Sequence, residues 1–154
     1  MGRHWMRIAA LAVGLFAVNV VARLVIRIWF SDDETAESHT SIVMFAVIGV
    51  LLAVITFIRA QQSRPGGWLP ELTAAAVGGM LLTILVGPFV SGDTPFGGGA
   101  GFFFSQVWLY GGFAIVGTLL GYWTATALGR DYRSRSLAAY TSARSARPHR
   151  TVRR

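Results

Sequence analysis

The sequence predicts an all-α integral membrane protein whose four transmembrane helices form a bundle. Three observations indicate this fold class. Hydrophobic residues make up 53% of the 154-residue chain and charged residues only 14%, whereas soluble domains average about 25% charged residues. Four apolar stretches are each long enough for a membrane-spanning helix. Arginine-containing and acidic loops alternate along the chain, as expected when successive loops lie on opposite sides of a membrane.

The first span is predicted over residues 8–30. As a helix this stretch measures about 34 Å, which exceeds a hydrocarbon core of about 30 Å. A short basic head precedes it, so the pattern also fits a signal peptide cleaved after the small residue Ala22. We favour an uncleaved anchor because the apolar residues continue beyond Ala22 to the end of the stretch.

The other three spans are predicted over residues 42–58, 72–90 and 102–128. A loop over 59–71 is expected between the second and third spans because its Pro and Gly residues interrupt a helix. Another loop contains a glycine-rich run at 97–101. That run lacks the following Lys and Ser or Thr of a phosphate-binding loop, so we interpret it as a connector.

Residues 129–154 form a basic tail, separate from the transmembrane domain of residues 1–128. All 14 basic residues of the chain are Arg, and eight of them lie in this tail. The tail has no periodic apolar face, so we expect it to be mostly disordered. Anionic lipid head groups are its nearest partners, at about 1 kcal/mol for each close Arg, and a cytosolic protein is the alternative. Nucleic acid is disfavoured because few aromatic residues accompany the arginines.

The loop charges predict the orientation of the protein. Arginines occur in the N-terminal head, in the loop over 59–71 and in the tail, which lie on one side of a four-span protein. The opposite loops lack Arg and contain Asp32, Asp33, Glu34, Glu37 and Asp93. The positive-inside rule therefore predicts that both termini are cytoplasmic. The use of Arg without Lys, with abundant Ala, Gly and Val, favours a GC-rich bacterial source and thus a bacterial inner (plasma) membrane.

Asn19, Arg23 and Arg27 recur at intervals of four within the first span and share one helical face. An arginine inside a span costs about 3 kcal/mol on insertion scales, so each needs a partner or water. One hypothesis is an outward-opening cleft in which the planar donors of Arg hold an anionic group, such as phosphate or carboxylate. We favour the alternative, in which both arginines snorkel to outer head groups or pair with the acidic outer loops.

Small residues form a stripe along the fourth span. They recur at steps of four, at Gly117, Gly121, Ala125 and Gly129. Small residues let the backbones of membrane helices approach closely, which drives helix association in lipid. We expect this face to pack the helices of one chain together, and an interface with another chain is the alternative.

The remaining motifs do not predict an enzyme. Glu71 begins the third span, where a carboxylate is favoured by the helix dipole and is near Arg59 or Arg64, and this role is favoured over proton transport. The acidic loop around His39 lacks the spacing of a divalent-cation site, so no metal is expected. The chain has no Cys, which excludes disulfides and cysteine nucleophiles. It also has no serine-hydrolase or zinc-protease motif, and we expect no catalytic residues and no cofactor.

The favoured function is therefore that of a small polytopic membrane protein that acts as a non-enzymatic accessory or scaffold subunit. It would use the small-residue stripe and the basic tail to bind a second copy or a larger membrane complex. The alternative is a small carrier or translocator of an anionic or lipid-linked substrate, which would use Arg23 and Arg27.

Overall fold

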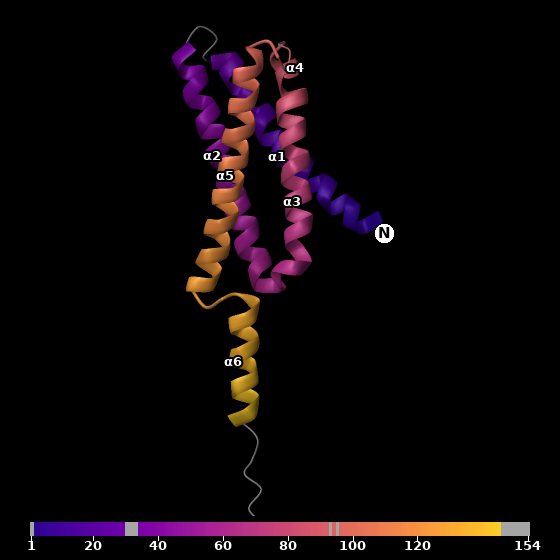
Figure 1. Cartoon of the computed structure of the whole chain (residues 1–154), viewed down its shortest axis with the longest axis vertical. Coiled ribbons are helices and arrows are strands. Elements are labelled where there is room, and N and C mark those ends of the chain that lie inside the picture. The colour runs from indigo at the N-terminus through magenta and orange to yellow at the C-terminus, as the bar shows by residue number, and fades with distance from the viewer. Residues whose placement is uncertain (1, 30–33, 93, 95, 146–154) are drawn as a thin grey trace, which may run out of the picture.

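The computed structural model of the chain is a bundle of long helices (Figure 1). It describes residues 2–29, 34–92, 94 and 96–145, except for the side chains of residues 2–3, 23, 26–29, 34–41 and 91. The described residues contain no strand. The elements in chain order are α1 (Gly2–Trp29), α2 (Glu34–Gln62), α3 (Pro65–Leu81), the π-helical turn η1 (Leu82–Val86), α4 (Gly87–Ser91), α5 (Gly99–Ala127) and α6 (Tyr132–Ser145).

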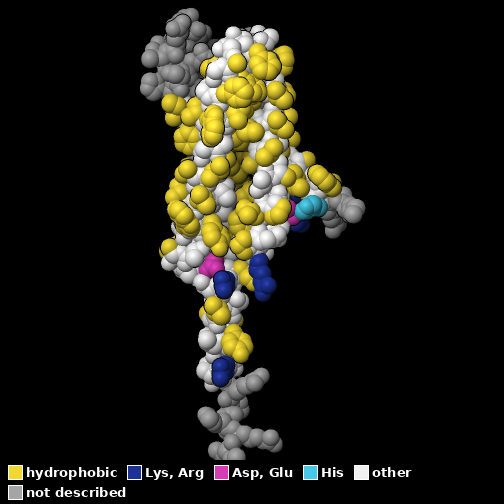
Figure 2. All heavy atoms as spheres, viewed as in Figure 1, with side chains coloured by type: hydrophobic (Ala, Val, Ile, Leu, Met, Phe, Trp, Pro, Cys, Tyr) yellow, Lys and Arg dark blue, Asp and Glu magenta, His cyan; other side chains and the backbone are white. Residues whose placement is uncertain are grey.

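Four stretches of the structure are long and apolar enough to cross a membrane, which confirms the predicted class at this level. They are His4–Ala22, Ile42–Gln62, Pro65–Val90 and a stretch within Gly99–Ser145 whose apolar part is α5. Only 17% to 33% of each apolar stretch is buried inside the chain. Figure 2 shows the resulting apolar surface along the bundle, which lipid would cover in a bilayer.

The helices extend further than the predicted spans. α2 continues to Gln62 and α3 already begins at Pro65, so the predicted loop over 59–71 is wrong for most of its length. Pro65 occupies the start of α3, where a missing N–H costs nothing because the first turn has no intrahelical acceptor for it. Pro70 lies inside α3 and is tolerated there, as prolines in membrane helices often are.

The contact between α2 and α5 brings two helix backbones together (Figure 1). Gly117 and Gly121 on α5 are buried. A Cβ atom on Gly117 would overlap the carbonyl oxygen of Gly49, and one on Gly121 would overlap that of Ala53. In a bilayer, lipid would provide no hydrophobic drive for helix association, and van der Waals contact at such close approach would stabilise the pair instead.

Larger side chains fill the rest of the interior. Phe45 on α2 and Tyr110 on α5 meet edge to face, with ring centroids 6.0 Å apart. Ile48 is fully buried next to them in the same core cluster. The second main contact joins α1 to α3, where Leu15 lies against Gly79. The bundle is therefore two helix pairs, α2 with α5 and α1 with α3.

Residues 132–145 form α6, whereas the sequence predicted a mostly disordered tail. Gly129 follows α5 with φ of 62°, a left-handed conformation that glycine adopts without strain. The Oδ2 atom of Asp131 then accepts hydrogen bonds from the backbone N–H groups of Arg133 and Ser134, which caps α6. None of the residues of α6 is buried, and the helix leaves the end of the bundle (Figure 1). The last residues of the tail lie outside the described part.

The glycine contact predicts a position-specific effect on stability. Gly117→Ala should lower the free energy of unfolding by about 1–3 kcal/mol, because its Cβ forces α5 away from α2. Gly112→Ala on the same helix is the matched control, since a Cβ there meets nothing within 4 Å. The control should be neutral or stabilising by up to about 1 kcal/mol. Thermal unfolding in detergent compares the two, and equal melting temperatures would contradict the contact.

Candidate functional site

Asn19 is a buried polar residue that links α1 to η1 within the third span. Its side chain is fully buried. The Nδ2 atom donates a hydrogen bond of 3.2 Å to the backbone carbonyl oxygen of Thr83. Thr83 belongs to η1, and π-helical turns of this kind are rare and often occur at functional positions. The contact of Asn19 with this turn is therefore a candidate functional position in the middle of the bundle.

Proline explains why this carbonyl needs Asn19. The N–H of Gly87 bonds to the carbonyl of Leu82, five residues back, as in a π-helix. Pro88 has no N–H to donate. The Thr83 carbonyl therefore receives no hydrogen bond from Gly87, the donor in an α-helix, or from Pro88, the donor position in a π-helix. A backbone group without a hydrogen bond is unfavourable in hydrocarbon, so the amide of Asn19 stabilises the turn.

Of the three side chains in the predicted anion site, the structure describes only that of Asn19. Asn19 faces the third span and uses its amide within the bundle. Arg23 and Arg27 lie in α1, but their side chains are outside the described residues. An anion held by Asn19, Arg23 and Arg27 thus stays a hypothesis, and Asn19 has a structural role that the spacing of four did not reveal.

Two hydroxyl groups add to the polar interior. The Tyr110 hydroxyl lies so close to Gly79 that a Cβ there would be 2.9 Å away. Within the described part of the chain, neither this hydroxyl nor that of Thr83 has a hydrogen-bond partner. Gln106, one turn before Tyr110 on α5, is also buried. The middle of the bundle therefore has hydrogen-bonding capacity that the described residues leave unused.

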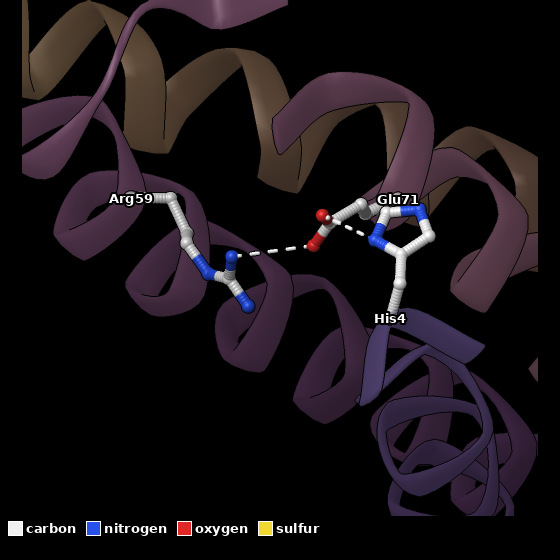
Figure 3. A network of polar contacts seen from close by, with 3 residues as sticks. All are labelled: His4, Arg59 and Glu71. Atoms are coloured by element: carbon white, nitrogen blue, oxygen red, sulfur yellow. Dashed lines mark hydrogen bonds and ion pairs between the residues drawn. The ribbon is translucent and has the colours of Figure 1, made fainter. Parts of the chain in front are cut away.

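Glu71 joins three helices near the opposite end of α3 (Figure 3). Its Oε1 atom lies 2.8 Å from Nδ1 of His4 on α1, and its Oε2 atom lies 3.4 Å from Nη1 of Arg59 on α2. The side chain of Glu71 is only 15% exposed. The predicted arginine is present, but the predicted position in the first helical turn is wrong, because α3 begins at Pro65 and has no acidic residue in its first turn. The sequence also missed His4, because only the crossing of α1 over α3 brings His4 and Glu71 together. The network ties the helix ends together.

A pocket of about 450 Å³ lies where α6 begins. The end of α2, the start of α3, the last turns of α5 and the first turn of α6 line it. The guanidinium of Arg64 lies over the ring of Tyr132, 5.9 Å from its centroid. Asp131 and Arg133 also line the pocket, so groups of opposite charge face the same space. No sequence motif predicted this arrangement.

Asp131 is the buried charged group of this pocket, with 8% of its surface exposed. It follows the end of α5 and so lies beyond the apolar helix. A hydrogen bond from the Ser134 side chain, which outweighs the opposing effect of desolvation, holds the pKa of Asp131 below its ordinary value. The carboxylate is therefore ionised at neutral pH. Its capping contribution is present above the pKa of the unfolded chain and is lost as the pH falls through the folded value.

The small-residue stripe lies inside the chain for most of its length. Gly117 and Gly121 contact α2, and Ala125 is fully buried one turn further along α5. Gly129 does not share this face: it lies beyond α5, it is exposed, and a Cβ there would meet nothing within 4 Å. Its left-handed φ shows that it serves the turn into α6 instead.

The acidic loop between α1 and α2 is largely outside the described residues. Asp32 and Asp33 are not described, and of Glu34, Glu37 and His39 only the backbone is. Among the residues with described side chains, no group of three His, Asp or Glu could hold a metal ion. The prediction that this loop binds no metal ion concerns side chains outside the described residues and stays a prediction.

Comparisons with protein-family models, with curated proteins and with solved structures found no match. The contacts of the chain itself therefore carry any functional proposal, because a helical bundle alone does not assign a function.

The role of Asn19 predicts a coupling with Pro88. Asn19→Ala should lower the free energy of unfolding by about 1 kcal/mol, because the Thr83 carbonyl loses its donor. In a Pro88→Ala background the backbone N–H is restored, so the same Asn19→Ala change should cost less. Unfolding in mixed micelles measures the four variants of this cycle. Strictly additive costs would contradict the explanation of the π-helical turn.

Proposed function

We propose that this chain is a non-enzymatic accessory or scaffold subunit that presents α6 to a partner protein. The observation that carries the proposal is that α6 is capped, fully helical and without a buried residue. An isolated helix of this length is marginal in water, so it gains stability when a surface covers it. A helix that is already formed also loses less entropy on binding than a disordered segment does.

The exposed side chains of α6 fit a groove in a protein. Leu137, Tyr140 and Arg144 recur at steps of three and four and so share one face of the helix. Leu137 is 58% exposed and Tyr140 is 65% exposed. An apolar pair next to an arginine suits a hydrophobic groove with an acidic rim. A helix that binds a membrane surface lies in its plane, whereas α6 continues along the length of the bundle (Figure 1).

The proposal includes the orientation predicted from the loops. Arg59, Arg64 and the arginines of α6 all lie at the end of the bundle where α6 leaves it, and Figure 2 shows basic side chains there. The positive-inside rule supports a cytoplasmic location for this end in a bacterial inner membrane. The carrier hypothesis depends on Arg23 and Arg27, and no contact within the described residues favours it.

Photo-crosslinking in native membranes tests the docking role. A photoreactive residue in place of Leu137 or Tyr140 should give the same higher-mass protein adduct from both positions. Trp108, which is 79% exposed on α5, is the control position and should give no such adduct. Adding Arg144→Glu should weaken the adduct at Tyr140 by about tenfold if an acidic rim binds the arginine. Lipid adducts alone from both α6 positions would instead show a helix on the membrane surface.

A further inference from the structure

We propose that the pocket at the start of α6 binds the head group of a zwitterionic aminophospholipid. The phosphate would lie on Arg64 and Arg133, and the ammonium group on Asp131. The volume of about 450 Å³ is within the range of small-molecule sites. The inference goes beyond the docking role of α6, because it uses the first turn of that helix and not the face around Tyr140.

The position of the pocket fits a lipid head group. It lies between the ends of the apolar helices and the polar helix α6. Tyr122, on the last turns of α5, lines it, and the neighbouring Trp123 is 61% exposed. Tryptophan is enriched at the level of the head groups in membrane proteins. A phospholipid whose acyl chains lie along α5 would therefore bring its head group to this depth.

Two arginines supply the phosphate contacts. The guanidinium of Arg64 lies over the Tyr132 ring at a cation–π distance of 5.9 Å, a contact that uses no N–H donor of the guanidinium. Planar donors of this kind suit phosphate oxygens. Arg133 lines the same pocket, and in the described residues neither arginine is paired with a carboxylate. The hydroxyl-bearing Ser136 is a further lining residue.

Asp131 provides an independent observation that points to a ligand cation. The carboxylate is 8% exposed and lines the pocket. Its Oδ2 atom is used by the helix cap, whereas Oδ1 has no hydrogen-bond partner among the described residues. A buried acceptor without a partner is costly, and an ammonium group with N–H donors would satisfy it.

The combination of charges selects among head groups. A simple anion would contact the arginines but would be repelled by the Asp131 carboxylate. A simple cation would contact the carboxylate but would be repelled by the arginines. A phosphate joined through two carbons to a primary ammonium satisfies both. A choline head group has the same charges, but its quaternary nitrogen has no N–H to donate to Asp131. We therefore assign the site to phosphoethanolamine rather than phosphocholine.

Native mass spectrometry of the full-length, detergent-solubilised protein tests the assignment. The probes are phosphatidylethanolamine, phosphatidylcholine and phosphatidylglycerol with identical acyl chains. The wild-type protein should bind phosphatidylethanolamine about tenfold more tightly than the other two. Equal binding of the ethanolamine and choline lipids, or tighter binding of phosphatidylglycerol, would overturn the proposal.

Three variants locate the binding. Asp131→Asn keeps the helix cap, since Asn caps as well as Asp, but should abolish the preference for ethanolamine over choline. Arg64→Gln should weaken all three lipids about tenfold. Arg135→Gln, on α6 but not in the pocket lining, should leave binding unchanged. A preference that survives Asp131→Asn, or an equal loss from Arg135→Gln, would overturn the proposal.

A soluble competitor separates a lipid from a free phosphoethanolamine compound. Glycerophosphoethanolamine at the same concentration as the lipid should leave the lipid bound. Its displacement of the lipid would overturn the assignment to a membrane lipid. These measurements involve no partner protein, so their failure is distinguishable from the failure of α6 to dock.

Discussion

The close backbone contact between α2 and α5 is the constraint on which the rest of the structure depends. Lipid tails are as apolar as leucine, so an apolar side chain gains no hydrophobic stabilisation when it moves from lipid to a helix interface. The association of two helices in lipid therefore depends on van der Waals contact at close backbone approach. Gly117 and Gly121 allow that approach to Gly49 and Ala53. Near the end of this pair, Ala60 of α2 and Tyr122 of α5 line the same pocket, together with Arg64 in the turn after α2 and with the first residues of α6. The pocket is thus a consequence of how the spans pack.

Polar contacts then fix the other helices against this pair. Pro88 removes a backbone donor, the third span widens into η1, and Asn19 of α1 bonds to the carbonyl that is left. Near the other end of the third span, Glu71 contacts both α1 and α2. These bonds are directional, unlike dispersion, so they define how α1 crosses the bundle. Pro88 in the third span therefore explains why the first span contains the polar residue Asn19.

The sequence allowed prediction of the helical class and the four apolar stretches, because both depend on composition and length. The predicted loop over 59–71 was wrong because Pro65 begins α3, and the sequence alone does not distinguish a proline that begins a helix from one that interrupts it. The sequence missed α6, whose main signal is the single cap at Asp131 rather than an apolar period. It could not predict the pocket or the His4 contact with Glu71, because these join residues that only packing brings together. The spacing of Asn19 indicated a shared face but not its acceptor on another helix.

In the proposed topology, four membrane spans place α6 and its pocket on the cytoplasmic side. Labelling with a membrane-impermeant maleimide tests it directly, because the chain has no Cys and any label reports an introduced thiol. Thr94, in the loop before α5, and Ser142, on α6, are both exposed, and the proposed topology places them on opposite sides of the membrane. Thr94→Cys should react in intact cells, and Ser142→Cys should react only after the membrane is opened. Reaction of Ser142→Cys in intact cells would contradict the orientation and the cytoplasmic role of α6.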